Sequence, residues 1–152
     1  MIYYKRKEER EDKTMTLWFD MDGTLADTMS EWWTLSDEQW IERVRNAKGM
    51  INLSAFAKLI HKAQRNGYKI GICSWLPKSN NEKVAEAKKF WLNNRLPSVQ
   101  WDFIDIVPNG EPKWLNHNGI LFDDNKRNRK EWTEHNGIAY NYNEILETLK
   151  AI

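Results

Sequence analysis

The stretch TLWFDMDGT, residues 16–24, decides the predicted fold. Its opening residues, 16–19, form a short, mostly apolar run, which is typical of a strand buried in a parallel sheet. Asp20 ends this run with a carboxylate, and Gly23 allows the chain to turn closely past it. We therefore expect a central strand that carries polar side chains at its carboxyl end.

Strand and helix patterns alternate along the rest of the chain. Further strands are predicted at residues 68–73, 103–107, 119–123 and 138–140. We also expect a mostly helical stretch at 25–49, helices at 54–67, 77–92 and 126–135, and a closing helix capped by Asn143. The helix at 77–92 is expected to turn inward Val84, Ala87, Phe90 and Trp91. This alternation predicts the α/β class, with a parallel five-stranded sheet, helices on both faces, and one domain at 15–152 with an insertion after the first strand.

The bulk properties exclude some classes of partner. Lys and Arg number 23 against 22 Asp and Glu, so the formal net charge of +1 gives no general attraction to nucleic acid or membrane. No apolar run approaches the roughly 20 residues that span a bilayer. Cys73 is the only cysteine and is expected to be a buried apolar side chain, which predicts a cytoplasmic protein. Residues 1–14 are predicted to be a charged leader, either a frayed helix or disordered.

Polar side chains follow several of the predicted strands where each strand ends. They are Asp20 and Asp22, Ser74, Asp123 and Asp124, with Lys113 nearby and Lys78 as an alternative lysine. Ligands bind beyond the carboxyl ends of parallel strands, so we expect these groups to meet at one rim. Crowded carboxylates repel one another, and a hard cation such as Mg²⁺ relieves that repulsion. The lysine and the serine hydroxyl would donate to phosphoryl oxygens. The alternative is a set of unrelated helix caps and turn residues.

These motifs resemble those of the haloacid dehalogenase (HAD) superfamily. The run DMDGT at 20–24 resembles the DxDGT signature, Ser74 the second motif, Lys113 the third, and Asp123-Asp124 the fourth. The resemblance covers residues 16–152 and implies a HAD-like Rossmannoid fold with Mg²⁺ as cofactor. It implies that Asp20 is the nucleophile and that Asp22 is the general acid and base.

The resemblance also assigns the remaining site residues. Mg²⁺ would be held by Asp20, by the backbone carbonyl of Asp22 and by Asp124, with Asp123 orienting Lys113 or the metal waters. Thr24 joins Ser74 and Lys113 as a predicted phosphate-binding residue. The second aspartate of the signature, which family members that dehalogenate lack, favours hydrolysis or phosphoryl transfer.

Within the superfamily the chain looks most like the 5′(3′)-deoxyribonucleotidase branch. The insertion at about 26–52 resembles a short form of the helical cap that follows the first motif, and Lys113 precedes Asp123 by ten residues. That branch places aromatic residues over the substrate base, and the candidates here are Trp32, Trp33 and Trp75. Tryptophans on a helix can equally form its core contact, so both roles stay open.

The predicted function is hydrolysis of a small phosphate monoester, with a nucleoside monophosphate as the first expected substrate. One alternative is a polynucleotide 3′-phosphatase, in which the basic run at 126–130 holds a nucleic-acid backbone. Another is a non-catalytic module that binds phosphate or a partner. His61, His117 and His135 show no ligand spacing and are expected to be structural. The oligomeric state is left open.

Overall fold

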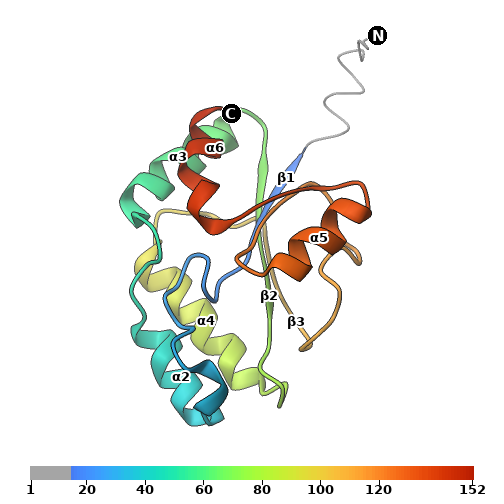
Figure 1. Ribbon diagram of the computed structural model, residues 1–152. Coiled ribbons are helices and arrows are strands. Elements are labelled where there is room, and N and C mark those ends of the chain that lie inside the picture. The colour runs from blue at the N-terminus through green and yellow to red at the C-terminus, as the bar shows by residue number, and fades with distance from the viewer. Residues whose placement is uncertain (1–14) are drawn as a thin grey trace.

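A parallel sheet forms the centre of the molecule. The computed structural model describes residues 15–152, and the predicted leader at 1–14 lies outside the described residues. The strands are β1 (Thr16–Phe19), β2 (Lys69–Trp75), β3 (Phe103–Val107), β4 (Ile120–Phe122) and β5 (Ile138–Tyr140). Their order is β3-β2-β1-β4-β5, and every pairing is parallel (Figure 1). The predicted five-stranded parallel sheet is confirmed.

Helices cover both faces of this sheet. They are η1 (Trp32–Thr34), α2 (Asp37–Asn46), α3 (Leu53–Arg65), α4 (Glu82–Arg95), α5 (Lys126–Glu134), η2 (Tyr142–Glu144) and α6 (Ile145–Lys150), where η marks a 3-10 helix. Figure 1 shows α2, α3, α4 and α6 on one side of the strands and α5 on the other. Among the described residues, no helix is both long and apolar enough to cross a bilayer.

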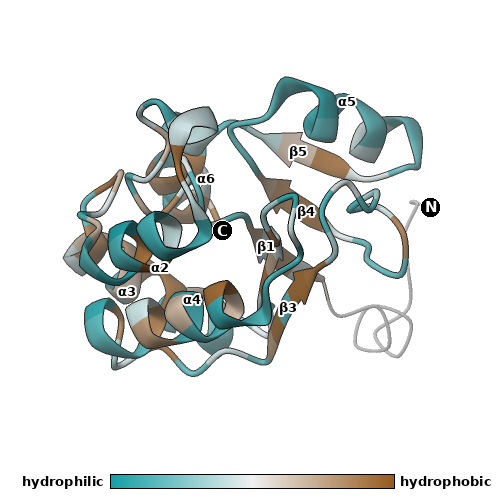
Figure 2. Ribbon diagram, turned by 90° about the horizontal axis from the view of Figure 1, so that it is seen from below, coloured by the Kyte–Doolittle hydropathy of each residue, from teal (hydrophilic) through white to brown (hydrophobic). Residues whose placement is uncertain are grey.

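Alternation along the strands divides the core into two layers. Leu17 and Phe19 point into the larger layer, which also receives Trp91 from α4, whereas Trp18 points into a smaller layer beside Trp132 of α5. Gly71 sits opposite Trp18 on β2, and a Cβ there would lie 2.5 Å from the indole ring. Figure 2 shows the result as hydrophobic strands β4 and β5 beneath a mostly hydrophilic α5.

The insertion after β1 is less helical than the sequence predicted. The expected helical stretch at 25–49 is instead a loop, the short η1 and the ten-residue α2. Ser36 starts α2 because its side chain accepts from the Gln39 backbone N–H while the Gln39 side chain accepts from the Ser36 N–H. Within 26–52 the regular helix is therefore confined to Asp37–Asn46, and the tryptophans of η1 lie in a separate short turn.

Several helix starts were predicted at the wrong residue. Asparagines cap α3, α4 and η2, namely Asn52, Asn81 and Asn141, in place of the predicted starts at Ser54, Pro77 or Ser79 and Asn143. Each asparagine side chain accepts a hydrogen bond from a backbone N–H in the first turn. The sequence alone does not reveal which of several nearby polar residues makes this contact. On α4 the predicted inward Phe90 is exposed beneath Arg45, and Lys88 is buried instead.

Candidate active site

Two neighbouring strands deliver carboxylates to the same edge of the sheet. Asp20 follows β1, and Asp123 and Asp124 follow β4, which pairs with β1. One oxygen of each carboxylate lies within 4.8 Å of an oxygen of the other two. With Asp22 and Lys113 these residues form what we call the carboxylate rim. The groups that the sequence analysis selected from separate strand ends thus lie together.

Lys113, and not Lys78, faces these carboxylates. Its Nζ donates to Asp20 Oδ1 and to Asp123 Oδ2, each at 2.8 Å, and the side chain is buried. Lys78 lines the same cleft but is exposed. An ammonium has three N–H donors, so Lys113 keeps one for a further acceptor.

The loop that carries Lys113 is tied to the sheet by His117. The ring Nδ1 lies 3.0 Å from the Lys113 carbonyl oxygen, and Nε2 lies 2.8 Å from Asp105 Oδ2 on β3. The ring also packs edge-on against Trp18, with centroids 4.6 Å apart. His117 is structural, as the sequence predicted, and the part it holds is the segment that positions Lys113.

Burial and mutual repulsion shift the ionisation of the rim. Burial raises the pKa of Asp20 well above its usual value, and Asp123 adds to this while Lys113 opposes it. Burial likewise raises the pKa of Asp124. Burial alone would lower the pKa of Lys113, but the carboxylates of Asp20 and Asp123 outweigh it and raise that pKa. The lysine therefore stays charged, and the rim favours additional positive charge.

Thr24 and Gly23 bring the two strand ends close together. The Thr24 hydroxyl lies 3.1 Å from Asp20 Oδ2 and 3.2 Å from Asp124 Oδ1, and it accepts the Asp124 backbone N–H. Gly23 has a φ of 77°, and a Cβ there would lie 2.4 Å from Asp124 Oδ2. The Thr24 side chain is thus directed at the carboxylates, and its predicted contact with phosphate stays a prediction.

The carboxylates divide into occupied and available ligands. Asp123 accepts from Lys113, from the Asn128 side chain at 3.1 Å and from the Asn125 backbone N–H at 2.9 Å. Both of its oxygens are therefore already engaged by protein donors. Asp20 and Asp124 retain oxygen lone pairs, and clustered carboxylate oxygens are the donors that Mg²⁺ prefers. The residues present fit this ion, with Asp123 in a supporting position.

Asp22 is held by a residue that the sequence analysis missed. Its Oδ1 accepts from the Thr28 hydroxyl at 2.7 Å, and its Oδ2 pairs with Lys88 Nζ at 2.9 Å. Lys88 also donates to Ser74 Oγ at 2.7 Å, so the serine at the end of β2 joins the same network. The signal was available, because Lys88 is four residues after Val84 on the apolar face of α4, where a lysine is unusual.

A cleft of about 450 Å³ opens above the rim. Its charged lining residues include Asp20, Asp22, Lys88, Lys113, Asp123 and Asp124. Its lining also includes the aromatic residues Trp32, Trp33, Trp40 and Trp75, with Met29, Leu35, Leu76 and Val84. We call Trp32, Trp33 and Trp75 the tryptophan wall. Trp33 is 69% exposed and Trp32 is 39% exposed, whereas Trp75 is anchored by its Nε1, which donates to the Glu111 carbonyl at 2.8 Å.

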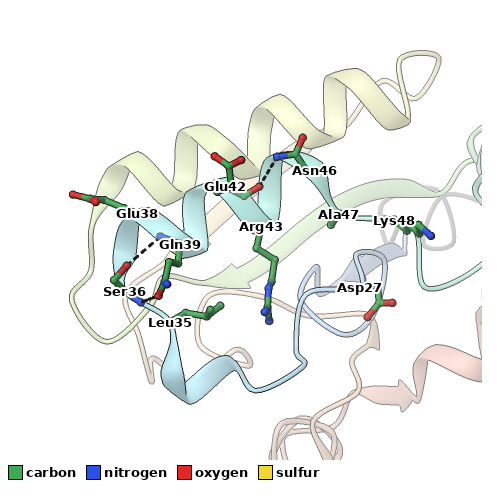
Figure 3. Close-up of a pocket in the computed structure, with 10 residues that line it drawn as sticks. All are labelled: Asp27, Leu35, Ser36, Glu38, Gln39, Glu42, Arg43, Asn46, Ala47 and Lys48. Atoms are coloured by element: carbon green, nitrogen blue, oxygen red, sulfur yellow. Dashed lines mark hydrogen bonds between the residues drawn. The ribbon is translucent and has the colours of Figure 1, made fainter.

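A broader hollow lies elsewhere, along α2 (Figure 3). It is lined by Asp27, Leu35, Ser36, Glu38, Gln39, Glu42, Arg43, Asn46, Ala47 and Lys48. It contains none of the rim residues, all of which line the cleft. Its useful feature is Arg43, which donates to the carbonyls of Thr28 and Ser30 and so fastens the loop between β1 and η1 to α2.

Comparison with known proteins places the fold. No protein-family model matches the sequence, and no curated protein matches it. A chain of the Pnkp1/Rnl/Hen1 RNA repair complex is similar, with a TM-score of 0.58 and 15% identity over 86% of this chain and 43% of that one. D,D-heptose 1,7-bisphosphate phosphatase from B. bronchiseptica, complexed with magnesium and phosphate, has a TM-score of 0.56 and 12% identity, over 83% of this chain and 78% of that one. The Burkholderia thailandensis enzyme of the same name has a TM-score of 0.52 and 11% identity, over 82% of this chain and 75% of that one.

At these identities the likeness is one of fold. It confirms the predicted Rossmann-like α/β class, which the sheet order and the helices on both faces already describe. The chain spans less than half the length of the matched chain in the RNA repair complex. The deoxyribonucleotidase branch stays a prediction.

Proposed function

We propose that this protein is a HAD-superfamily phosphatase that uses Mg²⁺ and hydrolyses a small phosphate monoester through an aspartyl-phosphate on Asp20. The observation that carries the proposal is the carboxylate rim itself. A buried ammonium bridges Asp20 and Asp123 at 2.8 Å each, and Asp124 lies beside them at the floor of a cleft. Phosphoryl transfer depends mainly on positioning and charge neutralisation, and this arrangement supplies both.

In the first half-reaction Asp20 attacks phosphorus and the bond to the leaving oxygen breaks. The free N–H of Lys113 and the hydroxyl of Ser74 donate to phosphoryl oxygens, while Asp22 gives its proton to the leaving oxygen. Asp20, Asp124 and the Asp22 carbonyl would hold Mg²⁺, which would neutralise phosphoryl charge. The products of this step are the free alcohol and the phosphorylated Asp20.

In the second half-reaction water attacks the aspartyl-phosphate. The Asp22 carboxylate now accepts a proton from that water, and the phosphorus–Asp20 bond breaks. Inorganic phosphate leaves, and Asp20 and Asp22 return to their starting states. Support for both roles comes from Asp22 and Asp20 lining the same cleft.

The favoured substrate is a nucleoside monophosphate. Support comes from the cleft, whose volume of about 450 Å³ lies in the range of small-molecule sites and whose tryptophan wall offers flat apolar faces. Aromatic faces stack on nucleobases with modest dependence on the base. The phosphate would lie at the rim and the base against Trp32 or Trp33.

A polynucleotide 3′-phosphatase is the second candidate. It is supported by the basic side chains of Lys126, Arg127 and Lys130, which are exposed on α5, and by Asn125 and Asn128 of the same segment, which line the cleft. The fold shared with a chain of an RNA repair complex is consistent with this candidate. A salt series separates the two, because backbone binding weakens steeply with salt whereas binding of a mononucleotide weakens less.

The decisive experiment is a phosphatase screen with Mg²⁺ over nucleotides, sugar phosphates and 3′-phosphorylated oligonucleotides. We expect release of phosphate by the wild type and loss of at least about 10⁴-fold in Asp20→Asn. Asp27→Asn serves as the matched control, because Asp27 is an exposed aspartate outside the cleft. A wild type that turns over nothing in the panel would instead support the non-catalytic binding module.

A further inference from the structure

Lys88 is a buried charge that the mechanism above does not use. It lies on α4 with 1% of its surface exposed, among the apolar residues Val84, Ala87 and Trp91. Its Nζ reaches the Trp75 carbonyl at 2.6 Å, Ser74 Oγ at 2.7 Å and Asp22 Oδ2 at 2.9 Å. All three N–H donors are therefore used. An ammonium buried at this depth is costly unless it is fully paired, so its position demands an explanation.

Each of the two buried lysines contacts a different one of the two aspartates in the DMDGT signature. Lys113 contacts Asp20, and Lys88 contacts Asp22. Their remaining partners differ, because Lys113 has a donor to spare whereas Lys88 has none. Lys113 is thus suited to reach a phosphoryl group, and Lys88 is suited to hold other side chains still.

The partners of Lys88 are groups whose direction matters. The Asp22 carboxylate is fixed from two sides, by Lys88 on Oδ2 and by Thr28 on Oδ1. Ser74 Oγ accepts from Lys88, so its own hydrogen is not used in this contact. A general acid must lie within hydrogen-bond reach of the leaving oxygen, so small rotations of Asp22 would lower the reaction rate strongly.

We propose that Lys88 is a positioning residue that fixes Asp22 for proton transfer to the leaving group. The proposal rests on the function proposed above. In the step concerned, the bond from Asp20 to phosphorus forms, the bond from phosphorus to the leaving oxygen breaks, and that oxygen takes the electron pair of the bond and the proton of Asp22. The Lys88 ammonium then compensates the negative charge that remains on Asp22.

The test compares leaving groups that do and do not need that proton. The alkyl ester that the wild type hydrolyses best leaves as an alkoxide unless it is protonated, whereas p-nitrophenyl phosphate leaves as a stable phenolate. We expect Lys88→Met to lower kcat/KM, which reports the steps up to release of the leaving group, about 100-fold more for the alkyl ester than for the aryl ester. Any effect through Ser74 acts on the phosphoryl group and is common to both esters, so it cancels in this ratio.

Lys89→Met is the matched control. Lys89 follows Lys88 on α4 and is exposed, so its substitution should leave both esters unchanged. Equal losses on the two esters in Lys88→Met would overturn the proposal and leave Lys88 as a structural residue. A wild type that hydrolyses neither ester would overturn the proposed function together with it, so the two failures are distinguishable.

A double variant guards against loss of folding. Lys88→Met strands the Asp22 charge, but Asp22→Asn with Lys88→Met leaves no lone ion in the site. If Lys88 acts through Asp22, adding Lys88→Met to Asp22→Asn should cost less than about threefold further on the alkyl ester. An undiminished further loss in that background, at an unchanged Tm, would contradict the proposal.

Discussion

The carboxylate rim and the tryptophan wall share one cleft but are built on opposite principles. Every charged side chain of the rim has a partner within 3.2 Å, and Asp20, Asp123 and Lys113 are almost wholly buried. The wall is loose by comparison, since Trp33 is 69% exposed and rises from a three-residue turn. Buried charges tolerate only a few arrangements, whereas exposed aromatic rings tolerate many. Under the proposed function, the rim would therefore fix the chemistry, and the wall would leave the choice of substrate open to change.

Removal of the rim's central cation should have the largest effect. Lys113→Met leaves Asp20 and Asp123 without the ammonium that each contacts at 2.8 Å. We expect kcat to fall about 10³-fold and the free energy of unfolding to fall by roughly 3–5 kcal/mol. Steady-state kinetics and denaturant unfolding measure the two effects.

Lys78→Met is the control for that prediction. Lys78 lines the cleft without contacting the rim, and its exposed side chain should be replaceable at little cost in stability. If Lys78→Met were the more damaging variant in kcat, Lys113 would be a structural lysine and the rim would lose its place as the reacting centre.

Loss of one proposed metal ligand should be the next largest effect. Asp124→Asn keeps the size of the side chain but removes a charge from the cluster that Asp20 shares. We expect Mg²⁺ affinity, measured by titration calorimetry, to fall roughly 100-fold. The metal-free variant should be no less stable than the wild type, because repulsion within the rim is relieved. Unchanged Mg²⁺ affinity would exclude Asp124 as a ligand.

The sequence predicted the rim better than the rest of the site, for a physical reason. Strand ends of a parallel sheet meet at one edge, so residues as distant as Asp20 and Asp124 could be placed together from their positions after apolar runs. The same logic predicted the sheet and the helices on both faces. Lys88 was missed because helix lysines usually face solvent, although its position four residues after Val84 on the apolar face of α4 was a signal.

The insertion was harder to predict because local signals compete within it. Apolar residues from Trp32 to Val44 suggested a mostly helical stretch, but the Ser36 capping box starts a new helix and leaves η1 separate. Two tryptophans that a continuous helix could have buried are thereby placed at the cleft. Which polar side chain caps a helix depends on backbone dihedral angles that composition does not determine.

The tryptophan wall should show a moderate effect that is confined to substrate binding. If a nucleobase stacks on Trp33, Trp33→Ala should raise KM for a nucleoside monophosphate about tenfold, as expected for one lost stacking contact. KM for glycerol phosphate and the Tm should not change, because the ring is mostly exposed. Equal KM values for the nucleotide in the variant and the wild type would show that the base does not stack on Trp33.

Trp91→Ala provides the contrast within the same residue type. Trp91 is fully buried, and its Nε1 donates to the Ala47 carbonyl at 2.9 Å. We expect Trp91→Ala to lower the free energy of unfolding by about 3–5 kcal/mol. KM in the folded fraction should stay close to the wild-type value. The two variants together separate a tryptophan that serves the fold from one that serves the substrate.

Arg43 should give the smallest effect, and it tests how the two regions are joined. It ties α2 to the loop carbonyls of Thr28 and Ser30, and this loop leads from the rim to the wall. Arg43→Ala should loosen the wall and raise KM about threefold, which corresponds to one or two hydrogen bonds of half-exposed groups. Arg45→Ala, a change on the same helix where the guanidinium lies over Phe90, is the control and should leave KM unaltered.

The response of kcat to Arg43→Ala then decides what holds Asp22. Thr28 contacts Asp22 through its hydroxyl, so a displaced loop removes one of the two supports of that carboxylate and leaves Lys88 as the other. Because the charged and buried partner should dominate, we expect kcat to stay within about twofold of the wild-type value. A fall of tenfold or more on an alkyl ester, with little change on an aryl ester, would show that the loop positions Asp22. The same loop would then control the positions of both the rim residue Asp22 and the tryptophan wall.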